Sequence, residues 1–243
     1  PAPAAVLAAA RRGLTDDRLA YTHAAGDDRL RARIAAHYGE AYGTEVSPER
    51  IVVTVGASGG FVLALLAAFD VGDRVGITEP GYAAYGNIIE ALGLELAGIR
   101  VGPETRYVPT VESLAAAGPL DGFVLASPSN PTGTTVTGPE LAVLAAYCER
   151  EGIRLVSDEI YHGITYGGPA PTAAARPGAI VVQSFSKYFS MTGWRLGWLV
   201  APDDLVRPLE RLPPPPAPPP PPPHPPPPPP PLPPPPPPGP NGP

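Results

Sequence analysis

Short apolar runs alternate with helix-patterned segments along most of this sequence, and this alternation constrains the fold more than any other feature. The strand-like runs fall at 50–56, 73–80 and 94–101, at the start of 121–133, and at 153–161, 178–186 and 194–202. The helix-like segments fall between them, at 57–70, 82–93, 111–118, 138–152 and 203–212. Strands that are apolar on both faces and are followed by helices indicate a sheet covered on both sides. The sequence therefore predicts an α/β fold with a mostly parallel central sheet and helices on both faces.

Composition divides the chain at Pro213, because all but six of the residues from there to the end are proline. Long proline runs have no backbone N–H to donate and show no apolar periodicity, so they cannot join a packed core. We therefore expect one folded domain over residues 1–212, followed by a disordered poly-proline tail over 213–243.

Charge and cysteine content narrow the function classes. The net charge of −6 lies within residues 1–212 and argues against nucleic acid or an anionic membrane surface as a partner. The single cysteine, Cys148, excludes an internal disulfide and fits a reducing compartment. No apolar stretch is long enough to span a bilayer, and residues 1–13 lack the basic start of a signal peptide. A cytoplasmic protein is the resulting expectation.

Polar residues with special chemistry gather where the predicted strands end. They occur in GASGG (56–60), EPGY (79–82), SPSNPTG (127–133), SDEIY (157–161) and SFSK (184–187). Ligands of such sheets bind at the carboxyl ends of the strands. The sequence therefore predicts one site to which all five segments contribute.

Lys187 and its surroundings suggest an amine beside an anion site. A lysine at the end of a buried strand loses part of its hydration, which favours the neutral, nucleophilic amine. Ser184, Ser186 and Arg195 supply donors suited to a phosphate. GASGG lets the N–H groups of a helix start face the same anion, although it matches neither the P-loop nor the dinucleotide fingerprint.

Asp158 follows apolar residues, so its carboxylate needs a cationic partner. A protonated pyridine nitrogen would serve, and a carboxylate there turns a pyridine ring into an electron sink. Asn130 and Tyr161 could then bind a ring hydroxyl, while Tyr82 could lie on the ring face. An amine, a phosphate, a pyridinium and a phenolic oxygen together describe pyridoxal 5′-phosphate.

Three motifs, taken together and in their order along the chain, resemble those of the class I/II (fold-type I) aminotransferases. They are SPSNPTG, SDEIY and SFSKYFSMTGWRLGW. The resemblance runs from about Tyr21 to Leu212. It implies that Lys187 forms the internal aldimine and shuttles a proton between the substrate Cα and the cofactor. Asp158 would hold the proton of the ring nitrogen.

The same resemblance implies the remaining cofactor contacts. Asn130 and Tyr161 would bind the ring hydroxyl, and Tyr82 would stack on the ring. The phosphate would be held by Ala57, Ser58, Ser184 and Arg195. Tyr21 matches a tyrosine that reaches the phosphate of the neighbouring subunit, which implies a homodimer.

Two family features do not match this sequence. The family has an N-terminal arm that closes over the substrate, and a C-terminal small domain whose arginine binds the substrate α-carboxylate. Proline stands in place of that domain from residue 213. We therefore expect the parent protein to transfer an amino group from an L-amino acid to a 2-oxo acid, and this chain alone to be a weak catalyst.

Other functions and simpler explanations stay open at this stage. A carbon–sulfur β-lyase dependent on the same cofactor would use the same first steps, since fold does not decide reaction. A non-catalytic scaffold could bind partners through a polyproline II tail. Individually, Lys187 could be a surface residue, Asp158 a helix cap or salt-bridge partner, and Tyr85 a core residue. The histidines show no metal-ligand spacing. The amino donor cannot be read from these motifs.

Overall fold

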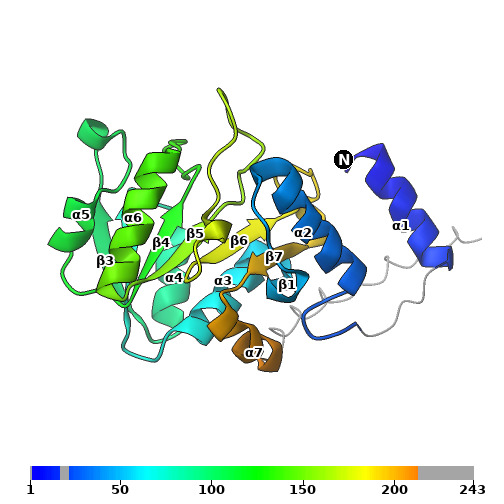
Figure 1. Ribbon diagram of the computed structural model, residues 1–243, viewed down its shortest axis with the longest axis horizontal. Helices are drawn as coiled ribbons and strands as arrows, with labels where there is room; N and C mark the ends of the chain where they lie inside the picture. The colour runs from blue at the N-terminus through cyan, green and yellow to red at the C-terminus, as the bar shows by residue number, and fades with distance from the viewer. Residues whose placement is uncertain (1, 17–21, 213–243) are drawn as a thin grey trace, which may run out of the picture.

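The structure is a computed structural model that describes residues 2–16 and 22–212, so the predicted proline tail lies outside the described residues. One seven-stranded sheet occupies the centre of the molecule, with the strand order β1-β7-β6-β5-β4-β2-β3 (Figure 1). The strands are β1 (Ile51–Thr54), β2 (Arg74–Glu79), β3 (Glu95–Arg100), β4 (Gly122–Ala126), β5 (Arg154–Asp158), β6 (Ile180–Ser184) and β7 (Gly197–Val200).

Strands β2 to β6 run parallel to one another, which confirms the predicted mostly parallel sheet. Strand β7 is antiparallel to both of its neighbours, β6 and β1. The connection between β6 and β7, residues 185–196, contains a 3₁₀ helix but no α-helix of the kind that usually links parallel strands, and β7 returns antiparallel beside β6.

Helices cover both faces of the sheet, as the sequence predicts. One face carries α2 (Asp28–Tyr42), α5 (Val111–Ala116) and α6 (Gly138–Glu151), and the other carries α3 (Gly56–Ala68), α4 (Ala83–Ala91) and α7 (Asp203–Arg211). Alternate residues of a strand supply the two cores. On β6, Val181 packs on the α2 side, while Ile180 and Val182 pack on the α3 side.

The sequence argument placed no helix before residue 50, yet the structure has two, α1 (Ala4–Asp16) and α2. Helix α2 begins after the N-cap Asp27 and ends at Gly43, whose φ of 63° is the left-handed conformation that favours glycine. It buries Ile34 and Tyr38 against the sheet. Helix α1 lies beside the sheet assembly and is largely exposed (Figure 1).

The prediction of strands that are apolar on both faces is wrong for β3. This strand lies at the edge of the sheet, and its residues alternate between exposed and buried over its second half. An edge strand has one neighbour, so one face can stay in contact with solvent. The short 3₁₀ helices are η1 (Pro48–Arg50), η2 (Pro103–Thr105), η3 (Ala173–Ala175) and η4 (Thr192–Trp194).

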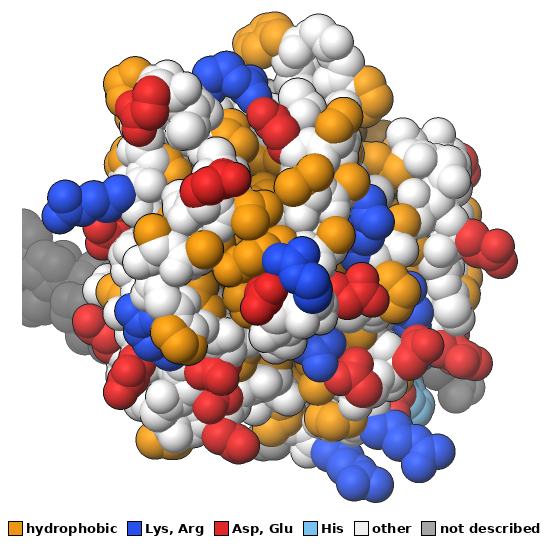
Figure 2. Space-filling view, turned by 60° about the vertical axis from the view of Figure 1, so that its left-hand side comes forward, with side chains coloured by type: hydrophobic (Ala, Val, Ile, Leu, Met, Phe, Trp, Pro, Cys, Tyr) orange, Lys and Arg blue, Asp and Glu red, His pale blue; other side chains and the backbone are white. Residues whose placement is uncertain are grey.

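Within residues 2–16 and 22–212, no helix has the length and apolar character needed to cross a membrane. Acidic and basic side chains are interspersed over the face that carries α5 and α6 (Figure 2). That face therefore presents no large field of one sign to an ionic partner.

Candidate active site

A pocket of about 290 Å³ lies at the carboxyl ends of the central strands, at the starts of α3 and α4. Nine of the ten residues predicted for the site line it: Ala57, Ser58, Tyr82, Asn130, Asp158, Tyr161, Ser184, Lys187 and Arg195. The tenth, Tyr21, lies outside the described residues. The structure thus brings together segments that are far apart in the sequence, as the strand-end argument anticipates.

Lys187 lies in the turn after β6, three residues beyond its last residue, Ser184. The Oγ of Ser184 accepts the N–H of Ser186 at 3.0 Å, and the carbonyl of Lys187 accepts the N–H of Ser190 at 3.0 Å. These bonds fix the backbone of the turn on both sides of the lysine. The Nζ of Lys187 lies 5.5 Å from the centroid of the Tyr161 ring.

The expected partial desolvation of Lys187 is not found in this chain. The residue is exposed, because the turn carries it past the end of the buried strand to the open side of the pocket. Its amine therefore remains in contact with solvent.

Arg195 contacts the start of α3, and together they form the cationic side of the pocket. A Cβ added to Gly56 would lie 2.8 Å from Nη2 of Arg195, so a larger residue here would push the guanidinium from its position. Gly56 also has a φ of 68°, in the left-handed region. The helix start behind it contributes Ala57 and Ser58 to the pocket. Backbone N–H groups of a helix start and a guanidinium both favour a bound anion.

The predicted strand over 194–202 is wrong at its beginning. Residues Thr192–Trp194 form the 3₁₀ helix η4, and the strand begins at Gly197. Arg195 lies between them with a φ of 51°, outside the strand conformation. This turn is what directs its side chain toward α3.

Asp158 ends β5, and its buried carboxyl group lines the pocket. It accepts a hydrogen bond from the hydroxyl of Tyr85 and another, at 3.1 Å, from the N–H of Ile160. Burial raises the pKa of Asp158 to about 6, against the opposing effect of these hydrogen bonds and of the Lys187 charge. The pocket therefore holds a carboxyl group whose ionised form needs a further positive partner.

Tyr85 packs in the core, as the sequence suggested, and the structure adds a contact with the site that the sequence did not indicate. It is buried, and it also contacts Asp158 through its hydroxyl. Burial and the neighbouring carboxylate raise the pKa of Tyr85, so the hydroxyl stays protonated and donates a hydrogen bond to Asp158. The spacing from Tyr82 was an available signal, since residues three apart share a helix face.

Tyr82, Asn130 and Tyr161 complete the lining. Tyr82 is 46% exposed, and its ring contacts that of Tyr85 with the centroids 5.4 Å apart. Asn130 lies in a turn with two cis peptide bonds, Ser127–Pro128 and Asn130–Pro131. The pocket thus offers a planar polar ligand an aromatic ring face together with an amide and a phenol group.

A larger groove, of about 600 Å³, lies beside α5 and α6 on the face seen in Figure 2. Its one basic lining residue, Arg106, pairs with Glu140, and Glu140 also caps α6. Among the described residues, no group of three or more His, Cys, Asp or Glu side chains could hold a metal ion. The chemistry therefore gathers in the smaller pocket.

The sequence matches the family model described as aminotransferase class I and II over residues 1–216. It is 49% identical to the valine–pyruvate aminotransferase of Mycobacterium tuberculosis, over 87% of this chain and 55% of that protein. It is 31% identical to an aspartate aminotransferase of Sulfolobus acidocaldarius, over 84% of this chain and 53% of that protein. The chain therefore spans about half the length of these relatives.

Solved structures agree with these matches. The crystal structure of an aminotransferase from Mycobacterium tuberculosis superposes with a TM-score of 0.82 at 49% identity, covering 86% of this chain and 58% of that one. The aspartate aminotransferase from Thermus thermophilus with maleate gives a TM-score of 0.82 at 31% identity, with coverages of 86% and 56%.

Proposed function

Because this chain belongs to the class I and II aminotransferase family, we propose that the protein of which it forms part transfers an amino group from an L-amino acid to a 2-oxo acid. Enzymes of this family depend on pyridoxal 5′-phosphate. The proposal extends to this chain as the part that binds the cofactor.

The residues of the pocket fit that cofactor. Gly56 leaves space that a Cβ would fill, and Arg195 and the start of α3 meet there as donors for a phosphate. Asp158 supplies a buried carboxyl group that lacks a strong cationic partner, which suits a protonated ring nitrogen. The exposed amine of Lys187 shares the pocket with both.

When bound, the cofactor supplies an electron sink that stabilises negative charge at the substrate Cα. We assign to Lys187 the transfer of the proton at that atom, and to Asp158 the retention of the proton on the ring nitrogen. Tyr85 keeps the carboxyl of Asp158 oriented by donating to it. Asn130 and Tyr161 would bind the ring hydroxyl, Tyr82 would cover the ring, and Ser184 would join Arg195 at the phosphate.

One observation carries the proposal: Lys187 and Asp158 line the same pocket as Arg195. Titration of the purified chain with pyridoxal 5′-phosphate should produce visible absorbance of the lysine-linked cofactor. Lys187→Ala should remove that absorbance. If the cofactor were linked to another lysine or amine of the chain, the same substitution would leave the absorbance unchanged. Retention of the band in the variant would refute the assignment of Lys187.

The reaction itself is tested on the protein that includes this chain. The relative named valine–pyruvate aminotransferase makes valine and pyruvate the first pair to assay. Formation of alanine and the oxo acid of valine would support amino transfer. Release of pyruvate and ammonia from an amino acid with a leaving group on Cβ, without amino transfer, would instead support the β-lyase.

The homodimer remains a proposal, supported by the match of Tyr21 to the tyrosine that the family places near the neighbouring subunit's phosphate. Sedimentation of the cofactor-bound protein at several concentrations would test it. The cytoplasmic location likewise remains a prediction.

A further inference from the structure

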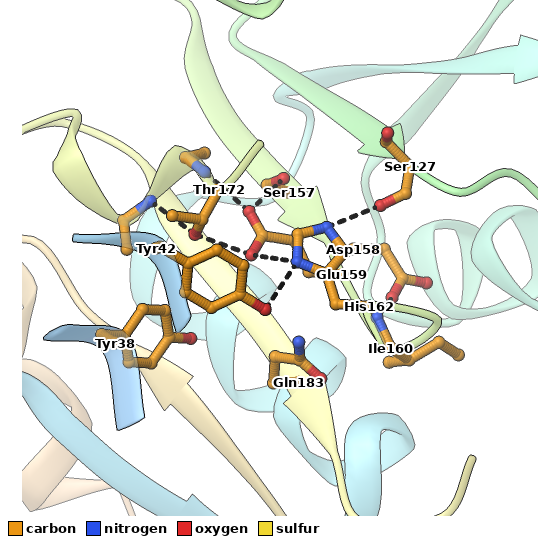
Figure 3. Close-up of polar contacts among 12 residues, drawn as sticks. Tyr38, Tyr42, Ser127, Ser157, Asp158, Glu159, Ile160, His162, Thr172 and Gln183 are labelled. Carbon is orange, nitrogen blue, oxygen red and sulfur yellow. Dashed lines mark hydrogen bonds and ion pairs between the residues drawn. The ribbon is translucent and has the colours of Figure 1, made fainter. Parts of the chain in front are cut away.

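A second polar cluster lies on the other face of the sheet from the pocket, where α2 packs (Figure 3). It consists of Tyr42, Glu159 and His162, and the last two are buried. Successive side chains of an extended segment point to opposite faces, so Asp158 enters the pocket while Glu159 turns toward α2. None of the roles proposed above uses these three residues.

The contacts of His162 define its tautomer. Nε2 lies 3.0 Å from the carbonyl oxygen of Ser127, which can only accept, so Nε2 carries the hydrogen. Nδ1 then accepts from the hydroxyl of Tyr42, also at 3.0 Å. Burial lowers the pKa of His162 to about 4, which leaves the imidazole neutral at pH 7. A neutral ring therefore links α2 to the end of β4.

Glu159 lies beside the imidazole and is fixed there by its own hydrogen bonds to other groups. Its Oε1 accepts the N–H of Ala173 at 2.7 Å and the hydroxyl of Ser157 at 3.1 Å. Its Oε2 accepts the hydroxyl of Thr172 at 2.8 Å and lies 3.4 Å from Nδ1 of His162. Both oxygens are hydrogen-bonded, so the carboxyl group is fixed in place beside the ring.

The imidazole connects two segments that carry predicted cofactor contacts. Ser127 stands three residues before Asn130, and His162 is adjacent to Tyr161. The N–H of Ser127 also donates to the carbonyl of Asp158 at 3.0 Å. The bond from Nε2 to the Ser127 carbonyl is thus a second link between the ends of β4 and β5, from the face opposite the pocket.

We propose that His162, held by Tyr42, is a positioning residue for the cofactor ring. This inference rests on the proposed function. By fixing Ser127 against the segment that follows β5, His162 sets the spacing between Asn130 and Tyr161. Its loss leaves a buried carbonyl without this partner and lets the turn that carries Asn130 shift, although every ring contact is still present in the sequence.

The test compares variants of the full chain by their affinity for pyridoxal 5′-phosphate, the visible spectrum of the complex and the melting temperature without cofactor. His162→Phe keeps an aromatic ring at this position and removes both hydrogen bonds, and should weaken cofactor binding about tenfold. His162→Gln places an amide N–H where Nε2 stood and should restore most of that affinity. Tyr42→Phe should weaken binding less, because it acts through His162.

Tyr38→Phe is the matched control, since it removes the same hydroxyl one turn earlier on α2, where Tyr38 is buried and Tyr42 is half-buried. The hydroxyl of Tyr38 accepts a hydrogen bond from Nε1 of Trp198 at 3.1 Å and does not contact His162. It should lower the melting temperature and leave cofactor affinity unchanged.

Unchanged affinity and spectrum in folded His162→Phe would overturn the inference, and so would a glutamine variant that binds as weakly as the phenylalanine one. If His162→Phe does not fold, Tyr42→Phe decides: affinity equal to that of Tyr38→Phe overturns the inference. If the unsubstituted chain shows no Lys187-dependent binding, the proposed function itself fails. If the unsubstituted chain binds the cofactor normally and the His162 and Tyr42 variants bind it equally well, only the positioning role of His162 fails and the proposed function stands.

Discussion

Replacing Asp158 with asparagine should stabilise the protein prepared without cofactor, even though it removes a proposed functional group. The carboxyl is buried, and burial raises its pKa from 3.8 to about 6. A carboxyl whose folded pKa is raised binds more protons in the folded than in the unfolded state. Its contribution to stability is therefore small below pH 4 and becomes increasingly unfavourable as the pH rises toward 6.

The shift of about two pKa units corresponds to about 3 kcal/mol once the group is ionised in both states. Integrated over pH, the destabilisation is small at pH 4 and rises to about 3 kcal/mol at pH 8. Asparagine carries no charge and can still accept the N–H of Ile160. Relative to the native protein, the variant should thus gain roughly 2 to 3 kcal/mol of stability between these two pH values.

Urea unfolding at pH 4 and pH 8, followed by the fluorescence of the buried Trp198, measures the difference. Glu159 and His162 also titrate in this range, and their effects largely cancel because both proteins contain them. Asp70→Asn, at an exposed position, is the control for removing one carboxylate charge from the protein. A stability difference for Asp158→Asn that does not depend on pH, or a less stable variant at pH 8, would refute the reasoning.

Three further predictions concern the other groups of the pocket. Arg195→Gln should weaken binding of pyridoxal 5′-phosphate about tenfold or more while leaving binding of pyridoxal, which has no phosphate, nearly unchanged in the same titration. Gly56→Ala should lower both stability and cofactor affinity because of its φ of 68° and its approach to Arg195, whereas Gly43→Ala, with a φ of 63° and open space around it, should lower stability alone in urea and titration experiments. Tyr85→Phe should raise the pKa of Asp158 further, since it removes a hydrogen bond that lowers it, and the pH dependence of unfolding should shift upward accordingly.

The sheet was predictable because most of its strands are buried on both faces and so stand out as continuous apolar runs; the edge strand β3 is the exception. Helix α2 was overlooked although it carries its own signals, an N-cap at Asp27, a glycine after its end and the buried residues Ile34 and Tyr38 at a spacing of four. The direction of β7 could not be read from its sequence, since apolar runs are the same in parallel and antiparallel strands. The connection that precedes β7, residues 185–196, has no α-helix, in contrast to the usual link between parallel strands.

The pocket was predictable to the extent that strand ends meet at one edge of a parallel sheet. The contact between Tyr85 and Asp158 could not be predicted from the sequence, because it joins residues 73 positions apart and depends on how α4 packs. The contacts of His162 also join residues that are far apart in the sequence, so they could not be predicted either. Its neighbours in the sequence suggest a structural residue, and only the fold brings Ser127 and Tyr42 to its two nitrogens.

Asp158 also shows how stability and binding are coupled in this pocket. Its burial destabilises the cofactor-free protein above pH 6, and the same ionised carboxyl attracts a protonated ring nitrogen. A ligand that binds only the folded state stabilises it by an amount set by its concentration relative to Kd. Saturating pyridoxal 5′-phosphate should therefore reverse the order of the two proteins at pH 8: the native chain should then melt above Asp158→Asn. If the asparagine variant gains as much from the cofactor, the carboxyl does not contact the ring nitrogen.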